Sequence, residues 1–304
     1  MPLDPTARVL IDAMEKSFPP LDPTISGTEM RARVEAAMAT MPHGAAPEPV
    51  GEVIDRTVPG PAGEIPVRIY RPAGEPVATI AFFHGGGFVL CDLDSHDGIC
   101  RALCKAASAV IVAVHYRRAP EARYPAAAED CYAVTQWASG NLGAGLPLAV
   151  FGDSAGGNLA AAVALMARDR GTPSLAAQIL VYPMLDSRGD TASHRETGDD
   201  YYLRHEEVMY YWGQYVGDPT QLTEPYASPT FADLAGLPPA LIATAEFDPL
   251  RDEGEAYADA LTAAGVRAVK HRYEGMFHSF LTFLGVLPAA TELRDEIAAF
   301  LHAG

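Results

Sequence analysis

Ser154 stands in a sequence context that is typical of an activated nucleophile. It lies between Gly152 and Gly156, where an apolar strand-like run, Leu148–Phe151, ends and an Ala-rich helical run follows. The flanking glycines are needed because a Cβ at either position would collide with the adjoining strand or helix of so tight a turn. Such a turn would hold the serine hydroxyl clear of a sheet, at the positive end of a helix where developing negative charge is favoured. The pattern therefore predicts nucleophilic chemistry at Ser154.

A serine hydroxyl needs a base to take its proton, and His278 is the best-placed of nine histidines. It follows the strand-like run Val266–Tyr273 across Glu274-Gly-Met-Phe277, which we expect to be a loop at the carboxyl edge of a sheet, where α/β proteins place their chemistry. Several other histidines precede the sheet, lie in strand patterns or an insertion, or close the last helix: His43, His115, His194, His205, His271 and His302. We therefore predict that His278 is the base.

A carboxylate must orient the imidazole and stabilise its cation. Asp248 ends the apolar run Leu241–Phe247, again at an expected carboxyl edge, and is the preferred candidate. Asp186, which follows Gln178–Leu185 in the same way, remains the alternative. Asp252 is interpreted as a first-turn carboxylate that the helix dipole favours.

Three successive glycines follow another apolar run, Ala78–Phe83, in the sequence His84-Gly-Gly-Gly-Phe88. Glycines leave their backbone N–H groups uncovered and allow an acyl oxygen to approach closely, and the N–H of Ala155 would add a further donor. A phosphate-binding loop is the alternative, but no Gly-Lys-Ser/Thr follows, and Asp92 and Asp94 would repel phosphate. We expect the histidine of this run to brace the loop through hydrogen bonds.

The elements that must position these groups alternate between strand and helix. This alternation predicts a mostly parallel sheet with helices on both faces. The strand-like runs are Ile65–Tyr70, Ala78–Phe83, Ala109–Val114, Leu148–Phe151, Gln178–Tyr182, Ala240–Ala245 and Val266–Tyr273. The helical patterns are Ala7–Met14, Glu29–Met38, Ala126–Ala138, Asn158–Arg168, Glu206–Val216, Asp252–Ala264 and Ala289–Leu301. The interval 187–237 shows no convincing strand and is interpreted as a helical insertion.

The composition excludes several classes of protein. The 304 residues are 49% hydrophobic and 20% charged, which supports a large core, and the net charge of −17 argues against a nucleic-acid or anionic membrane partner. The four cysteines form no CxxC pair, so reduced, buried thiols are a better interpretation than disulfides or zinc ligands. The start of the chain resembles no signal peptide, and no run is long enough for a membrane helix. We expect a cytoplasmic protein.

Four ordered motifs together resemble the hormone-sensitive lipase family (bacterial family IV) of esterases in the α/β-hydrolase superfamily. They are His84-Gly-Gly-Gly-Phe-Val-Leu, Gly152-Asp-Ser-Ala-Gly-Gly-Asn-Leu-Ala160, Asp248-Pro-Leu-Arg-Asp-Glu253 and Gly275-Met-Phe-His278, and the order Ser154, Asp248, His278 is that of the α/β-hydrolase triad. The resemblance implies an eight-stranded, mostly parallel sheet with helices on both faces. It also implies hydrolysis of short- to medium-chain carboxylic esters, with the backbone N–H groups of Gly86, Gly87 and Ala155 as oxyanion donors.

The same resemblance implies a domain organisation. Residues 1–50 and the insertion 187–237 would form a helical cap over a catalytic core of residues 51–186 and 238–304. Four positions depart from the usual family pattern, although none belongs to the triad: Cys91, His115, Arg118 and Ser279. Of these, Cys91 and Ser279 could alter the width of the pocket.

The insertion is rich in aromatic and flexible apolar residues, which could line a pocket for the acyl or alcohol group or merely pack the cap onto the core. The residues assigned here to substrate binding are Phe88, Tyr202, Met209 and Trp212. The expected reaction is two-step acyl transfer to water on a small-molecule ester, without a metal or organic cofactor. A non-catalytic small-molecule receptor and an amidase or acyltransferase remain alternatives, and the sequence is compatible with a homodimer.

Overall fold

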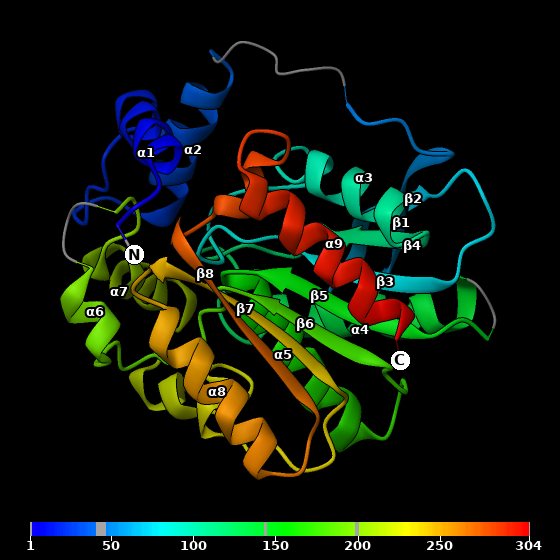
Figure 1. Cartoon of the computed structure of the whole chain (residues 1–304). Helices are drawn as coiled ribbons and strands as arrows, with labels where there is room; N and C mark the ends of the chain where they lie inside the picture. The colour runs from blue at the N-terminus through cyan, green and yellow to red at the C-terminus, as the bar shows by residue number, and fades with distance from the viewer. Residues whose placement is uncertain (1, 41–46, 143–144, 198–200, 304) are drawn as a thin grey trace.

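A computed structural model describes residues 2–40, 47–142, 145–197 and 201–303 (Figure 1). The described residues form an eight-stranded sheet in the order β1-β2-β4-β3-β5-β6-β7-β8. The pairs β1–β2 and β2–β4 are antiparallel, and all the other neighbouring strands are parallel. The prediction of a mostly parallel sheet is confirmed.

The central strands are largely apolar because helices cover both faces of the sheet, although they also bury the polar Thr79 and Gln178. The strand bounds are β1 Glu52–Gly60, β2 Gly63–Arg71, β3 Ala78–Phe83, β4 Ala109–Val114, β5 Leu148–Asp153, β6 Ala177–Val181, β7 Ala240–Phe247 and β8 Ala268–Phe277. Every residue of β3, β4, β5 and β6 is buried. Sequence analysis missed β1, because this edge strand buries only Val58 and so has no apolar face in its pattern.

The helices form a layer on each face of the sheet. The helix bounds are α1 Pro5–Ser17, α2 Gly27–Met38, α3 Asp97–Ala106, α4 Ala126–Asn141, α5 Ala155–Arg170, α6 Ala192–Glu196, α7 His205–Tyr215, α8 Arg251–Ala263 and α9 Pro288–His302. One buried cluster joins the sheet to residues of α4, α5, α7 and α8, and a second joins it to residues of α1, α3 and α9. Figure 1 shows α3 and α9 in front of the sheet and α4 and α5 behind it.

Helices α1, α2, α6 and α7 gather at the end of the molecule to which the parallel strands point (Figure 1). Helix α7 contacts the N-terminal segment directly, because the Tyr210 hydroxyl donates a hydrogen bond to the carbonyl of Ile25 at 3.1 Å and Gln214 Oε1 accepts one from the N–H of Gly27 at 2.9 Å. Apart from residues 198–200, which are not described, the interval 187–237 contains α6, α7 and two short 3₁₀ helices, Pro219–Thr223 and Pro229–Phe231, and no strand. The carboxyl ends of the parallel strands are thus covered by two segments far apart in the sequence.

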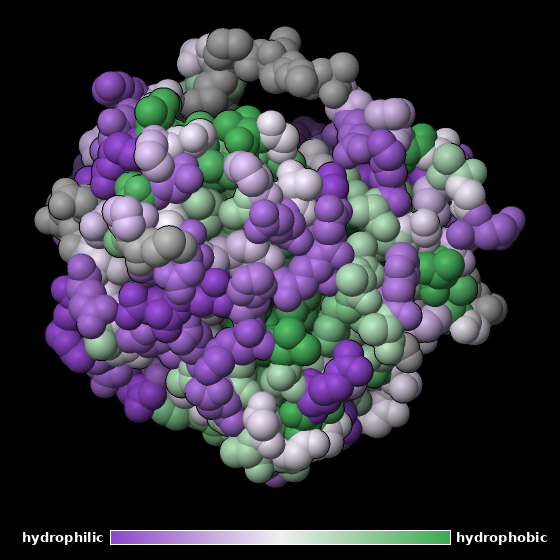
Figure 2. Space-filling model, viewed as in Figure 1, coloured by the Kyte–Doolittle hydropathy of each residue, from purple (hydrophilic) through white to green (hydrophobic). Residues whose placement is uncertain are grey.

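Hydrophilic and hydrophobic residues are distributed unevenly over the face shown in Figure 2. Hydrophilic residues cover most of the left half of the face in Figure 2, where α6, α7 and α8 lie, and hydrophobic residues are scattered over the rest in smaller groups.

Among the described residues, no helix combines the length and apolar character needed to span a bilayer. All four cysteines are free thiols, of which Cys100, Cys104 and Cys131 are buried and Cys91 is half-buried. The described part of the chain holds no group of three or more His, Cys, Asp or Glu residues arranged to bind a metal ion.

Candidate active site

Ser154 occupies a strained turn between β5 and α5. Its φ of 56° and ψ of −121° lie in a region that side chains other than glycine rarely adopt. A Cβ on Gly152 would lie 2.0 Å from the carbonyl oxygen of Gly156, and a Cβ on Gly156 would lie 1.9 Å from that of Phe83. Both flanking glycines are therefore required by close backbone contacts. The N–H of Ser154 also donates to the carbonyl of Val181 at 2.9 Å, which fixes the turn to β6.

A continuous hydrogen-bonded chain links Ser154, His278 and Asp248. The distance from His278 Nε2 to Ser154 Oγ is 2.9 Å, and that from His278 Nδ1 to Asp248 Oδ2 is 2.7 Å. The side chains are withdrawn from solvent, with exposed fractions of 7% for Ser154, 4% for His278 and 0% for Asp248. Asp248 Oδ1 also accepts a hydrogen bond from the N–H of Leu250 at 2.9 Å, which fixes the carboxylate.

His278 directly follows a strand, whereas the sequence predicted that it follows a loop. The expected loop Glu274–Phe277 belongs to β8, which runs on to Phe277 past a register shift against β7. His278 thus follows the last residue of a longer strand, because the irregular pairing lets the chain continue to the carboxyl edge. The ring of Tyr182 lies 4.8 Å from the imidazole, centroid to centroid, and confines it.

The other acidic and histidine candidates lie elsewhere. Asp186 forms an ion pair with Arg188, and Asp252 lies in the first turn of α8, where it accepts from the N–H of Ser193 at 2.8 Å. His84 is buried beside Tyr116, whose hydroxyl donates to the His84 carbonyl at 2.8 Å, and burial lowers the pKa of His84 to about 3. The structure thus brings Asp248, rather than Asp186, to His278, and His84 braces its loop as expected. His43 lies outside the described residues.

The glycine-rich loop after β3 presents backbone donors beside Ser154. Gly86 and Gly87 have φ values of +100° and +60°, which glycine adopts without strain. Across the described part of the chain, no protein atom accepts a hydrogen bond from the N–H groups of Gly86, Gly87 or Ala155. The loop is held by its own backbone, because the Gly86 carbonyl accepts from Val89 at 3.0 Å and from Leu90 at 2.7 Å. These N–H groups are therefore free to bind an oxyanion.

Asp153 ties the two catalytic loops together, a role that sequence analysis missed. It is buried, and its carboxylate accepts hydrogen bonds from the N–H of Gly85 at 3.0 Å and from His96 Nε2 at 3.3 Å. Burial raises the pKa of Asp153, but His96, followed by His84 and His278, brings it below its usual value. The only signal in the sequence was its place next to the serine, since no short-range pattern pairs it with Gly85 or His96.

Helix α7 forms a roof over the glycine-rich loop. The Tyr211 ring lies against Gly87 so closely that a Cβ there would be 2.3 Å from its Cγ. Tyr211 is therefore the aromatic residue that touches the oxyanion loop, although it was not among the four assigned to substrate binding. In the sequence, Tyr211 is one of several aromatic residues of the insertion. Only the packing of α7 distinguishes it from the others.

The four residues assigned to substrate binding have two kinds of environment. Phe88 is 0% exposed and stacks on Tyr215 with a centroid distance of 3.7 Å, while Trp212 is 1% exposed and lies 5.8 Å from Phe88. Tyr202 and Met209 are only half-buried. Phe88 and Trp212 therefore pack α7 onto the core, while a direct contact between any of the four and substrate remains a prediction.

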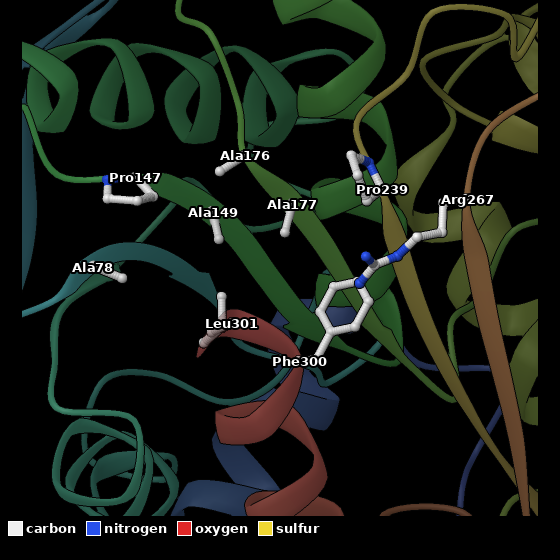
Figure 3. A pocket seen from close by; sticks show the side chains of 9 residues that line it. All are labelled: Ala78, Pro147, Ala149, Ala176, Ala177, Pro239, Arg267, Phe300 and Leu301. Atoms are coloured by element: carbon white, nitrogen blue, oxygen red, sulfur yellow. The ribbon is translucent and has the colours of Figure 1, made fainter. Parts of the chain in front are cut away.

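A small hollow lies far from these groups. It is lined by residues at the amino ends of β3, β5, β6 and β7 and by the end of α9: Ala78, Pro147, Ala149, Ala176, Ala177, Pro239, Arg267, Phe300 and Leu301 (Figure 3). Its volume is about 40 Å³, and the Arg267 guanidinium lies 5.2 Å from the centre of the Phe300 ring. The hollow is at the edge of the sheet opposite Ser154 and carries no group suited to catalysis.

The geometry on the carboxyl edge is therefore that of a serine hydrolase on an α/β sheet. A base within hydrogen-bonding distance of a hydroxyl, a buried carboxylate behind it and free N–H groups nearby are what acyl transfer requires. A family model described as "alpha/beta hydrolase fold" matches residues 80–282.

Several known proteins of similar sequence or structure are named as esterases. The carboxylic ester hydrolase LipN of Mycobacterium tuberculosis is 43% identical over 287 residues, which is 90% of this chain and 75% of LipN. The carboxylesterase NlhH of the same organism is 39% identical over 303 residues, 95% of this chain and 92% of NlhH. The solved structure of a Pyrobaculum calidifontis esterase has a TM-score of 0.88 and 41% identity, with 99% of each chain covered. The chain belongs to the hormone-sensitive lipase family of α/β-hydrolases, and it is a carboxylesterase that acts on small-molecule esters.

Proposed function

We propose that Ser154, His278 and Asp248 are the catalytic triad of this esterase and that the N–H groups of Gly86, Gly87 and Ala155 bind the oxyanion. The observation that carries this assignment is the pair of hydrogen bonds made by one imidazole, 2.9 Å to the hydroxyl and 2.7 Å to the buried carboxylate. The imidazole can take the serine proton through Nε2 while Asp248 stabilises the resulting cation through Nδ1. The Ser154 hydroxyl is thus hydrogen-bonded to the same nitrogen, His278 Nε2, that must accept its proton.

The reaction proceeds through an acyl-enzyme. His278 Nε2 takes the Ser154 proton as Oγ bonds to the ester carbonyl carbon, and the carbonyl oxygen becomes an oxyanion at the three N–H groups. The tetrahedral intermediate then breaks its bond to the alkoxide, which leaves as the alcohol with the proton from His278. A water molecule next gives a proton to His278 and attacks the acyl carbon. Collapse of the second intermediate releases the acid and returns the proton to Ser154.

We further propose that residues 1–50 and 187–237 form a cap over a core of residues 51–186 and 238–304. The contacts of α7 with Ile25 and Gly27 support a cap built from both segments. The cap leaves little room above the nucleophile, because Tyr211 covers Gly87 and Ser154 is only 7% exposed. This enclosure supports a preference for short- to medium-chain acyl groups.

Four measurements test the proposal. Ser154→Ala should lower turnover of 4-nitrophenyl acetate by several orders of magnitude, since triad members act as a unit, and an organophosphate should label the native enzyme once, at Ser154. The triad assignment is contradicted if Ser154→Ala turns over the ester nearly as fast as the native enzyme, or if the organophosphate labels a residue other than Ser154. A rate profile from 4-nitrophenyl acetate to palmitate should peak at short or medium chains, and a maximum at palmitate contradicts that preference. Matched ester and anilide substrates, with and without an added alcohol acceptor, separate an esterase from an amidase or acyltransferase.

A further inference from the structure

Three half-buried polar groups in α7 or just before it have no hydrogen-bond partner among the residues that the structure describes. They are the hydroxyls of Tyr202 and Tyr211 and the Oε1 atom of Glu207. None of the three forms a hydrogen bond or a short ion pair within the described residues, and none is among the fully buried unpaired atoms. Polar groups left unpaired in a partly buried place are well suited to receive a ligand.

The start of α7 fixes Glu207 in this position. Glu207 is the third residue of the helix, and its Oε2 accepts a hydrogen bond from the N–H of Arg204 at 2.9 Å in a capping box. Tyr211 follows one turn later, on the same side of the helix, and its ring lies against Gly87 of the oxyanion loop. Glu207 therefore faces the same space as Tyr211, above the proposed catalytic groups.

The electrostatic influences among these groups have the directions that this placement implies. Burial raises the pKa of Tyr211 well above its usual value, and the negative charge of Glu207 raises it further. Burial, Cys91 and Glu207 together raise the pKa of Tyr202. Burial, helped by Glu206, also raises the pKa of Glu207 itself, while Arg204 and His278 act in the opposite direction.

The charge of Glu207 is not neutralised by an ion pair. The Arg204 guanidinium is directed to Glu15 of α1, at 3.8 Å, and forms no salt bridge with Glu207 within the described residues. The adjacent Glu206 is exposed and points a second carboxylate to solvent. Arg204 still lies near enough to lower the pKa of Glu207, but it does not form a salt bridge with that carboxylate within the described residues. The start of α7 thus presents a carboxylate close to two tyrosine rings, and a carboxylate with aromatic rings is the chemistry that binds organic ammonium groups.

We propose that Glu207, Tyr202 and Tyr211 make this esterase selective for esters that carry a cationic group, over neutral esters of the same shape. The inference rests on the proposed function, since it concerns the same site. A substrate ammonium near Glu207 would be attracted by the carboxylate and could contact the tyrosine rings, whereas an ester with a second carboxylate would be repelled. Glu207 acts here as a specificity-determining residue and takes no part in bond making.

Pairs of substrates that differ only in charge test this selectivity. The alcohol-side pair is 2-(trimethylammonio)ethyl acetate and 3,3-dimethylbutyl acetate. The acyl-side pair consists of the 4-nitrophenyl esters of 4-(trimethylammonio)butyric acid and 5,5-dimethylhexanoic acid. The readout is the ratio of kcat/KM for the cationic ester to that for its neutral partner, which cancels any loss that affects both substrates equally.

Glu207→Gln removes the charge but keeps an oxygen for the Arg204 N–H, so the helix start is preserved. For at least one pair, the ratio should fall by about tenfold relative to the native enzyme, the size expected for a charge pair partly screened by solvent. Glu206→Gln removes the same charge one residue away, at an exposed position, and should keep the native ratio. Glu207→Met is a second variant with the same expected fall, should Glu207→Gln not fold.

The possible results separate the two proposals. The assignment of Glu207 is overturned if its variants keep the native kcat/KM ratio for both substrate pairs. It is also overturned if Glu206→Gln lowers the ratio as much as the Glu207 variants do. Failure of the native enzyme to hydrolyse any of the four esters, cationic or neutral, instead contradicts the proposed esterase site.

Discussion

The N–H of Gly85 donates a hydrogen bond to Asp153 Oδ1 at 3.0 Å and so joins the glycine-rich loop to the turn that carries Ser154. The two residues are 68 positions apart in the sequence, and each lies at the carboxyl end of a neighbouring parallel strand. Gly86 and Gly87, two of the proposed oxyanion donors, follow directly after Gly85, and the proposed nucleophile Ser154 follows directly after Asp153. This bond therefore helps to set the distance between those donors and the serine. Asp153 is therefore a positioning residue for the proposed reaction.

Loss of Asp153 should impair the chemical step more than substrate binding. Asp153→Ala removes the acceptor for Gly85, and we expect kcat to fall by about 10- to 100-fold, because misplaced oxyanion donors lose part of their stabilisation. Asp153→Asn keeps an acceptor oxygen and should recover part of the loss. Steady-state kinetics with 4-nitrophenyl butyrate check this, and a change confined to KM, with no rescue by Asn, would count against a positioning role.

Asp248→Asn should abolish most of the activity without unfolding the protein. An amide at this position cannot stabilise the imidazolium and favours the wrong imidazole tautomer, so kcat should fall by about 10³- to 10⁴-fold. Asp186→Asn, at the alternative acid suggested by the sequence, is the matched control and should keep kcat within about threefold, because Asp186 pairs with Arg188 instead of His278. The reverse outcome for the two variants would reassign the acid.

Gly156→Ala should be poorly tolerated, because its Cβ would lie 1.9 Å from the carbonyl oxygen of Phe83 and only backbone movement could relieve the contact. We expect a loss of at least about 3 kcal/mol in the free energy of unfolding or no folded protein at all. Gly98→Ala in α3 meets no atom within 4 Å and should stabilise by about 0.5–1 kcal/mol. Urea denaturation followed by circular dichroism measures both, and equal stability of the two variants would contradict the steric argument.

Stability should depend on pH through Glu253, a buried carboxyl group that accepts hydrogen bonds from the N–H groups of Leu185 at 2.6 Å and Asp186 at 3.2 Å and lies 3.3 Å from His194 Nε2. Burial raises its pKa to about 7, so the folded protein holds this proton more tightly than the unfolded chain. The resulting stabilisation is complete below the usual glutamate pKa and disappears as the pH rises through about 7.

Glu253→Gln removes that proton equilibrium. The melting temperature of the native protein, minus that of Glu253→Gln, should therefore decrease between about pH 5 and pH 8. Glu255→Gln on the same helix, where the carboxylate pairs with Arg272 at 2.7 Å, is the control. A difference for Glu253→Gln that stays constant over this range, or rises with pH, would show that the buried group does not titrate as described.

Local signals explain why much of the fold was predictable. The run Ala109–Val114 is apolar throughout and the run Ala78–Phe83 is apolar except for Thr79, and the structure has strands with those same bounds. The triad candidates were recognised because each lies within a few residues after an apolar strand-like run, and such positions meet at one edge of a parallel sheet. The hairpin strand Glu52–Gly60 and the extension of β8 to Phe277 were missed, since edge strands and irregular pairing depend on partners that local periodicity does not contain.

By itself, the sequence determined the family, the order of strands and helices, and the three side chains that follow the strand ends. Only the tertiary structure decided which acid faces His278, that Asp153 holds the glycine-rich loop, and that Tyr211 and Glu207 form the roof. The physical reason is that nucleophile turns and buried strands are specified by neighbouring residues and steric limits. The contacts of Tyr211 with Gly87 and of His278 with Ser154 instead join residues 124 positions apart, and their geometry follows from how the helices pack on the finished sheet.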